Sequence, residues 1–188
     1  MKKKGERSMA MILALAMVFV NLFVSPVWAE PGDVKIDETN FPDPIFRQYV
    51  RRFDKNGDNK LSQAELDAVD DINVDSDDIS SLKGLEHFTK LKVLNCIRNK
   101  LTTLDVSKNP DLENLVCSMN KLTSLDVSNN PKLETFWCSR NQLTSIDVSH
   151  NPKLEYFICD NNQLSALDVS KNPELIKLHC YYNQVLSL

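Results

Sequence analysis

Apolar residues recur along the chain with a period of 21 positions from Leu91 onward. Each unit reads L-x-x-(L/F)-x-C-x-x-N-x-(L/V), and a fixed period of this length is the signature of a repeat architecture with one coil per unit. The pattern therefore predicts a solenoid over residues 69–188. Its coils are an irregular first coil 69–90, four regular coils 91–111, 112–132, 133–153 and 154–174, and a partial coil 175–188.

Within each unit the pattern changes from a buried strand to a turn and then to a return segment. Leu91 and Leu94 begin the first regular unit, and Asn99 marks a tight turn. The phrase LDVS that follows alternates apolar and polar residues, which favours a second, strand-like segment with its polar side chains outward. Because no single coil can bury its own apolar edge, we expect the coils to stack and to align these residues in buried columns.

One of these columns consists of cysteine. Cys96, Cys117, Cys138, Cys159 and Cys180 share one inward position of the repeat. Their number is odd, and coils stacked about 4.8 Å apart suit packed thiols better than one cross-link per pair. We therefore expect free cysteines that act as small core hydrophobes. A disulfide or metal role is the alternative, since disulfides are the usual state of cysteines in exported proteins.

The first 29 residues predict export. A head with four Lys or Arg residues precedes an apolar run from Met9 to Val24, and small residues lead up to Ala29. These features are typical of a cleaved signal peptide over residues 1–29, with an uncleaved membrane anchor as the alternative. Removing four basic residues and one acidic residue takes the formal net charge from -4 to -7. We expect no nucleic-acid partner for so acidic a chain, and no membrane span once the signal is removed.

The unit LENLVCSMNKLTSLDVSNNPK, from Leu112, resembles the repeats of leucine-rich-repeat proteins, and more narrowly those of the internalins. The chain is most similar to the internalin J type, which also has 21-residue coils with Cys where other internalins place Leu. The resemblance covers Val69 to Leu188. It implies an α/β-type repeat fold, a leucine-rich-repeat solenoid with parallel β-strands on its concave face and little or no helix on its convex face. It also implies adhesion or host contact.

The segment from Phe41 to Val69, before the repeats, resembles a single EF-hand. Asp43 and Pro44 are suited to begin a helix, and a second helix is expected near Ser62. Oxygen ligands recur between the helices at the spacing of a calcium loop. The candidate ligands are Asp54, Asn56, Asp58, the backbone carbonyl of Lys60, Ser62 and Glu65.

The sixth place of this loop departs from the EF-hand pattern. It is normally Gly but is Asn59 here, although Asn tolerates the left-handed conformation better than most residues. An ordinary capping box of Ser62 and Glu65 around a solvated acidic turn is the alternative. Three oxygen-bearing residues at alternate places and a final Glu favour calcium. We therefore expect residues 30–68 to form a helical, EF-hand-like cap on the solenoid, stabilised by one structural calcium ion.

The residues that flank the buried Leu and Cys of each strand are expected to face the concave side. Aromatic and apolar residues recur among them, on a face that needs none for folding, which is typical of an interaction site. Residues that simply favour exposed β-strands are the alternative. The candidate binding residues are Val116, Met119, Trp137, Arg140, Tyr156, Ile158, His179, Tyr181 and Tyr182.

The repeat pattern favours a binding protein over an enzyme. Catalysis needs unlike groups that converge in a pocket, whereas a repeat supplies rows of like groups, and no nucleophile or phosphate-binding motif accompanies the three histidines. We expect a secreted or cell-surface recognition module that binds a protein or peptide through its concave face. A structural or self-assembling scaffold, or a fragment of a larger surface protein, is the alternative. It is suggested by the chain's end at Leu188 inside a coil, which predicts end-to-end self-association.

Overall fold

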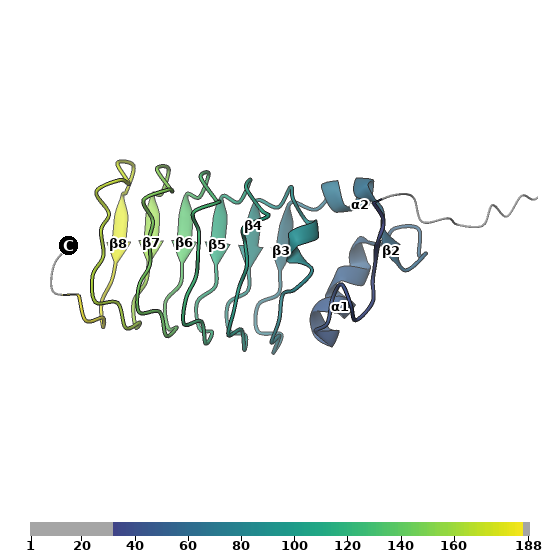
Figure 1. Cartoon of the computed structure of the whole chain (residues 1–188), viewed down its shortest axis with the longest axis horizontal. Coiled ribbons are helices and arrows are strands. Elements are labelled where there is room, and N and C mark those ends of the chain that lie inside the picture. The colour runs from purple at the N-terminus through teal and green to yellow at the C-terminus, as the bar shows by residue number, and fades with distance from the viewer. Residues whose placement is uncertain (1–31, 186–188) are drawn as a thin grey trace, which may run out of the picture.

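The computed structural model describes residues 32–185 and shows a row of stacked coils with a small helical cap at its amino-terminal end (Figure 1). The signal peptide expected over residues 1–29 lies outside the described residues. Each coil contributes one strand to a six-stranded sheet in which the strands pair in chain order. The strands are β3 (Asp71–Asn73), β4 (Val93–Asn95), β5 (Asn114–Val116), β6 (Thr135–Trp137), β7 (Tyr156–Ile158) and β8 (Lys177–His179).

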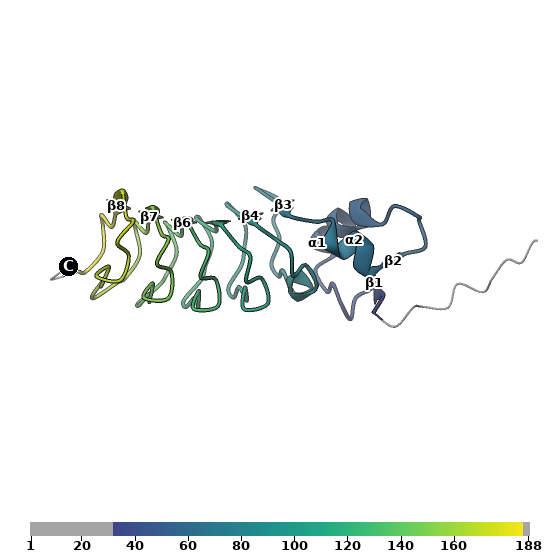
Figure 2. The ribbon, with the colours of Figure 1, turned by 90° about the horizontal axis from the view of Figure 1, so that it is seen from above.

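Neighbouring strands of this sheet are parallel and in register. Their pairing aligns Leu94, Leu115, Phe136 and Phe157, so that equivalent residues of successive coils lie beside one another. Seen from above, the strands lie along one side of the stack of coils (Figure 2). Outside the sheet the described coils carry one short 3₁₀ helix, η2 (Leu85–His87), in the first coil. The predicted solenoid of 21-residue coils with parallel strands on one face is confirmed.

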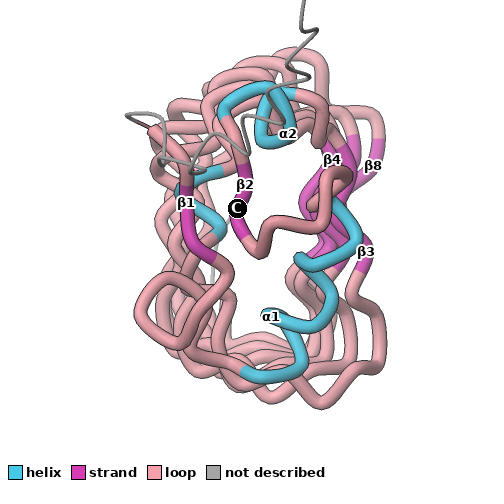
Figure 3. Tube along the Cα trace, turned by 90° about the vertical axis from the view of Figure 1, so that its right-hand side faces the viewer, coloured by secondary structure: helices cyan, strands magenta, loops and turns pink. Residues whose placement is uncertain are grey.

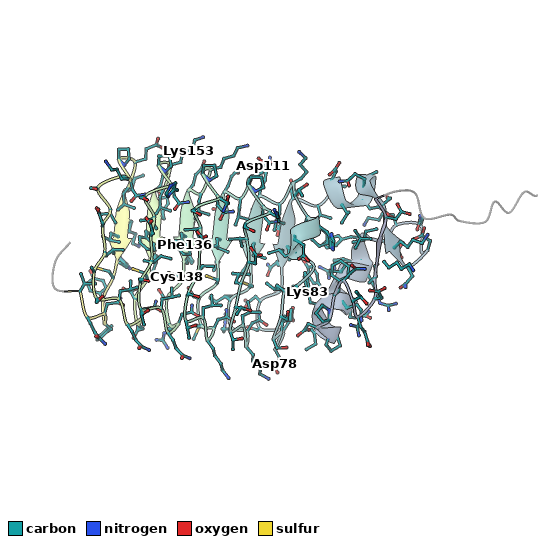
Figure 4. The ribbon with its side chains drawn as sticks, viewed as in Figure 1. Asp78, Lys83, Asp111, Phe136, Cys138 and Lys153 are labelled. Carbon is teal, nitrogen blue, oxygen red and sulfur yellow. The ribbon has the colours of Figure 1, made fainter. Side chains whose placement is uncertain are left out.

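The interior of the stack is built from the apolar columns of the repeat. Figure 4 shows Phe136 and Cys138 inside the stack, with Asp111 and Lys153 at one edge. The rings of Phe136 and Phe157 stack with their centroids 5.3 Å apart and their planes 6° from parallel. The first leucine of each of the four regular coils is fully buried. Stacking therefore buries what a single coil would leave exposed.

The return segments are buried as expected, but they do not form strands. Val106 is fully buried, yet the part of the chain that the structure describes has no β-ladder on this side of the coils. The carbonyl of Val106 accepts instead from Asn130 Nδ2 at 3.0 Å. The carboxylate of Asp105 accepts from the N–H of Ser107 at 2.9 Å. Because side chains take up these backbone groups, no second ladder forms, and the strand-like prediction for this segment is wrong.

The cap contains short helices and a two-stranded ribbon (Figure 3). The two ribbon strands pair antiparallel, with Val34 opposite Leu61 and Lys35 opposite Lys60. The sequence pattern did not predict this ribbon. The elements of the cap are β1 (Val34–Lys35), α1 (Pro44–Val50), the 3₁₀ helix η1 (Arg51–Phe53), β2 (Lys60–Leu61) and α2 (Gln63–Asp67).

Both α-helices of the cap begin at the residues predicted from the sequence. Asp43 precedes α1, and its carboxylate accepts from the N–H groups of Ile45 and Phe46. Ser62 precedes α2 and forms a reciprocal capping box with Glu65. Side-chain caps satisfy N–H groups that have no partner within a helix, so these local interactions define where each helix starts.

Hydrogen bonds join the cap to the first coil. Asp43 Oδ2 accepts from the N–H and the hydroxyl of Ser80, both at 2.8 Å. The hydroxyl of Tyr49 accepts from the N–H of Asn73, in β3, at 2.9 Å. The buried apolar residues of the cap and of the coils belong to one continuous core. The cap therefore covers the first coil and does not form a separate domain.

Candidate functional site

The candidate site is the side of the six-stranded sheet that faces away from the core, called here the outer sheet face. In each strand the middle residue points inward, and the residues before and after it point outward. Phe136, for example, is fully buried, while Thr135 and Trp137 on either side of it are not. Two columns of outward residues run across the strands. The first is Asp71, Val93, Asn114, Thr135, Tyr156 and Lys177, and the second is Asn73, Asn95, Val116, Trp137, Ile158 and His179.

Four of the predicted binding residues lie together in the middle of this face. The register pairs Val116 with Trp137 and Trp137 with Ile158, so the indole lies between two aliphatic neighbours. Tyr156 is two residues before Ile158 on the same strand and points to the same side. We call Val116, Trp137, Tyr156 and Ile158 the central patch. Trp137 is 40% exposed and Tyr156 is 38% exposed, so large aromatic surfaces remain in contact with water.

His179 and Tyr181 continue the outer sheet face beyond the central patch. Their rings lie 5.4 Å apart. His179 Nδ1 lies 3.9 Å from Asp160 Oδ2, and Asp160 Oδ1 accepts from the N–H of Tyr181 at 2.7 Å. Asp160 thus lies beside the His179 ring and bonds to the backbone of Tyr181, although it was not among the predicted set. The only signal for it in the sequence is a carboxylate at a position where the two preceding coils carry Ser.

The other three predicted residues lie in turns at one edge of the sheet and not on its strands. Met119, Arg140 and Tyr182 are exposed and have positive φ angles of 59°, 55° and 55°. Arg98 and Asn161 occupy the equivalent turns with the same backbone conformation. A non-glycine residue in this region is strained, and only Asn adopts it readily. These side chains form an edge row beside the outer sheet face.

Two ladders of asparagine hold the coils in place. Asn99 and its equivalents were expected in the turns, and they donate to backbone carbonyls of the preceding coil as well as their own. A second ladder was not predicted. Its members, in the NP phrase of each unit, donate to two backbone carbonyls apiece and are almost fully buried. These are Asn109, Asn130, Asn151 and Asn172.

The five cysteines are free. Cys96, Cys117 and Cys138 are fully buried, and burial raises the pKa of each thiol well above its usual value. Burial also raises the pKa of the Cys159 thiol to about 12. Buried, free thiols behave as small hydrophobic side chains, so these cysteines fill the core as expected.

The predicted calcium ligands lie in and beside the loop between η1 and α2. Asn59, at the sixth place, has φ of 64° and so adopts the left-handed conformation that Gly would supply. Asp54 accepts from the N–H groups of Gly57 and Asn59, at 2.7 Å and 2.9 Å. Glu65 Oε1 accepts from the N–H of Lys55 at 2.7 Å. The N–H of Ser62 and its hydroxyl also donate to Glu65, and the Ser62 N–H is the largest cause that holds the pKa of this carboxyl below its usual value.

The remaining predicted ligands follow the same loop. Asn56 Oδ1 accepts from the Asp58 N–H at 2.9 Å, and Asp58 Oδ1 accepts from the Lys60 N–H at 2.9 Å. The donor types and the backbone fit an oxygen-liganded cation. The carboxylates are, however, bonded to loop N–H groups, and within residues 32–185 no three His, Cys, Asp or Glu side chains are gathered closely enough to hold a metal ion. The capping box of Ser62 and Glu65, expected as the alternative, is present.

Comparison with known protein families identifies the repeats as leucine-rich repeats. The model of the family described as Leucine Rich repeats (2 copies) matches residues 110–150 and 131–172. The chain matches no curated protein sequence. In the part of the chain that the structure describes, no helix has the length and apolar character needed to cross a membrane.

Several solved structures resemble this chain over much of its length. The functional domain of InlJ from Listeria monocytogenes, described as including a cysteine ladder, is 35% identical with a TM-score of 0.77; the match covers 83% of this chain and 35% of that one. A leucine-rich-repeat protein from Leptospira interrogans is 28% identical with a TM-score of 0.62, over 64% of this chain and 33% of that one. The internalin InlF of Listeria monocytogenes, 20% identical with a TM-score of 0.56 over 82% of this chain and 60% of that one, shares the fold. The chain thus spans about a third of the length of the first two structures.

Proposed function

The chain is a leucine-rich-repeat protein whose coils are similar to those of internalins, and from this premise we propose that it recognises a protein or peptide partner through its outer sheet face. The observation that carries the proposal is the central patch. Trp137 and Tyr156 remain more than a third exposed. The core of their coils is filled by other residues, such as the fully buried Phe136 and Phe157, so folding does not need these two aromatic side chains. Exposed aromatic residues beside aliphatic ones are typical of the centre of a protein interface.

A partner that covers the patch would gain from removing apolar surface from water. Tryptophan and tyrosine also hold their shape at low cost in side-chain entropy, since each has only two rotatable side-chain bonds. The strands beneath them are fixed by ladders of hydrogen bonds on both sides, so binding requires little ordering of the protein. The arrangement suits binding, not catalysis.

The test is a comparison of single substitutions on the same fold. We expect Trp137→Ala to weaken binding to a purified partner by at least about tenfold, which is the size of effect typical of an aromatic hot spot. The matched control is Ile45→Ala. Ile45 is 41% exposed, close to the 40% of Trp137, but lies on α1 of the cap and is not part of the central patch. Biolayer interferometry measures the affinity of both variants for the partner. Equal affinities of Trp137→Ala and Ile45→Ala would rule out recognition through the central patch.

We further propose that the protein is exported and acts at or outside the cell surface, in adhesion or host contact. The support comes from the signal-peptide pattern of residues 1–29 and from the similarity to internalins. Expression of the full chain followed by amino-terminal mass analysis tests it. We expect the protein in the medium to begin at Glu30. Retention of residues 1–29 on a membrane-bound product would contradict it.

Structural calcium in the cap is also a proposal. Asp54, Asn56, Asp58, the carbonyl of Lys60, Ser62 and Glu65 would supply oxygen ligands, and an ion there would brace the loop between η1 and α2. Melting curves with calcium and with a chelator test it. We expect calcium to raise the midpoint and Glu65→Gln to abolish that rise, while Glu38→Gln, with a side chain 86% exposed, keeps it. An unchanged midpoint would contradict the proposal.

Self-association is a second candidate function, favoured by β8. Among the described strands, β8 pairs with β7 alone. Leu175, Leu178 and Cys180 are only partly buried, whereas the equivalent residues of the preceding coil are fully buried. A free strand beside half-buried apolar residues can pair with another copy. Light scattering over a range of concentrations tests this, and a monomer at every concentration would exclude it.

A further inference from the structure

A hollow of about 450 Å³ lies where the cap meets the first strand of the sheet. Its volume falls in the range of small-ligand sites, roughly 300–1,000 Å³. Asp71, one of the residues that line it, is also the β3 member of the first column of the outer sheet face. The hollow therefore opens beside that face, at its amino-terminal end.

One part of the lining is apolar and comes from the cap and from its link to the sheet. Phe53 ends η1, Ala64 lies in α2, and Ala68 and Val69 follow it. Val69 is buried, whereas both alanines are exposed. Such a surface can pack against the methylene stem of a long side chain.

The remaining lining is charged, with three carboxylates, Glu65, Asp70 and Asp71, and one ammonium, Lys55. Asp70 and Asp71 are exposed, and neither takes part in any salt bridge within residues 32–185. Glu65 is already bonded to the N–H of Lys55. The ammonium of Lys55 donates to the carbonyl of Arg52 at 3.1 Å, so the carboxylates outnumber the one cation of the lining by three to one. Two carboxylates thus border an apolar floor.

The opposite end of the same column carries the opposite charge. Lys177 is exposed on β8, five strand spacings from Asp71, which corresponds to about 24 Å. An extended chain covers that distance with about seven residues. The central patch lies between the two ends. A segment that crosses the outer sheet face from Asp71 to Lys177 would therefore pass carboxylates first, then the central patch, and finally a cation.

We propose that the hollow binds an arginine or lysine side chain of the peptide partner that the outer sheet face recognises. The inference rests on the proposed function and adds the chemistry of one anchoring residue. The methylene stem of that residue packs on Phe53, Ala64 and Ala68. Its cationic head lies beside the carboxylates of Asp70 and Asp71. Arginine and lysine combine an apolar stem with a positive head, which matches this floor and this rim.

The experiment uses acetyl-arginine amide as the probe and acetyl-citrulline amide, which has nearly the same shape without the charge, as its matched control. Methyl signals of Ala64, Ala68 and Val69 are followed by NMR in the protein without residues 1–29. We expect the arginine probe to shift these signals saturably and the citrulline probe to bind at least fivefold more weakly. Asp70→Asn with Asp71→Asn should weaken the arginine probe about fivefold. Asp78→Asn, an exposed carboxylate in a turn of the same coil, should leave it unchanged.

The inference is overturned if the two probes bind equally, if the methyl signals do not move, or if the double variant binds like the parent. Stronger binding of acetyl-glutamate amide at these signals would overturn it as well. Melting curves establish that the variants are folded, and Asp71→Asn alone repeats the test with a smaller change. Trp137→Ala should not alter binding of the probe. Failure at the hollow with partner binding still lost in Trp137→Ala would therefore reject the anchor and leave the proposed function intact.

Discussion

Asn120 donates its side-chain amide to the backbone carbonyl of Cys96, one coil earlier, at 2.9 Å. The same Nδ2 donates to the carbonyl of Cys117 in its own coil at 3.0 Å, and Oδ1 accepts from the N–H of Leu101 at 3.0 Å. One buried amide thus bonds to three backbone groups and connects two coils, and each of the two carbonyls also accepts from a neighbouring member of the ladder, Asn99 or Asn141. This bond pattern recurs from coil to coil and connects the turns at the edge of the outer sheet face.

Removing one member of this ladder should cost much more than removing an exposed neighbour. Asn141→Ala leaves the N–H of Leu122 without its partner and removes one of the two side-chain donors to each of the carbonyls of Cys117 and Cys138. We expect a loss of about 2–4 kcal/mol in the free energy of unfolding, measured with urea. Gln142→Ala is the control because its side chain is exposed, and it should cost less than about 0.5 kcal/mol. Similar losses in both variants would contradict the role of the ladder.

Gly84 is required by the contact between the first coil and the cap. It has φ of 106°, and a Cβ atom there would collide with the ring of Phe41 and lie 2.7 Å from the carbonyl oxygen of Asn40. We expect Gly84→Ala to lower the free energy of unfolding by at least about 2 kcal/mol. Gly32 also has a positive φ, 126°, but has open space around it. Gly32→Ala therefore measures the cost of backbone strain without a steric collision. Equal effects of the two substitutions would show that packing against Phe41 is unimportant.

The hydrogen bonds that Ser80 donates to Asp43 in the cap should make the free energy of unfolding depend on pH. Burial alone would raise the pKa of this carboxyl, but the hydrogen bonds from Ser80, Phe46 and Ile45 outweigh it and lower the pKa below 3.8. A folded pKa below the unfolded value means that the carboxylate stabilises the protein above about pH 3.8 and loses this effect as pH falls further.

Asp43→Asn should therefore cost about 1–2 kcal/mol at pH 7, and the difference from the parent should shrink as the pH is lowered from 4 to 2. Urea denaturation at each pH measures it. Asp67→Asn, an exposed carboxylate in α2, serves as the control with little difference at any pH. A difference for Asp43→Asn that stays constant across this range would contradict the assignment.

The cysteine column should be protected from alkylation in the folded protein. Four thiols are fully buried, whereas Cys180 is only partly buried. We expect iodoacetamide at pH 8 to modify Cys180 first and the other four only after unfolding, because their protonated thiols are poor nucleophiles. Mass spectrometry of the alkylated protein gives the order. Simultaneous modification of all five, or masses lowered by disulfide formation, would contradict a column of free thiols.

The solenoid could be predicted from the sequence because the same pattern of buried and turn residues occurs in five successive units. A buried Leu, a buried Cys and a turn Asn at fixed spacing leave one way to stack the coils. The helix starts at Asp43 and Ser62 were predictable for another reason, since capping depends only on residues close in sequence.

Features that depend on distant residues could not be predicted in this way. The pairing of Val34 with Leu61 joins segments with no shared pattern. The hollow beside Asp71 is lined by residues close in sequence, between Phe53 and Asp71, but its shape depends on how η1, α2 and β3 are arranged in space. The prediction of strand-like return segments was wrong because the alternation in LDVS fits two structures. One is a strand, and the other is a buried turn whose carbonyl accepts from Asn130 or its equivalents. Of the predicted binding residues, Met119, Arg140 and Tyr182 lie at the edge because the chain turns sharply after Cys.

Trp137 itself offers the most direct measurement of recognition through the outer sheet face. It is the one tryptophan that remains once residues 1–29 are removed, so its fluorescence reports the central patch alone. Acrylamide quenching is recorded for the free protein and for the protein saturated with a purified partner. We predict that binding lowers the quenching constant severalfold and shifts the emission to shorter wavelength, because the partner covers a side chain that is 40% exposed in the free protein. A saturated complex in which Trp137 is quenched as readily as in the free protein would contradict the account.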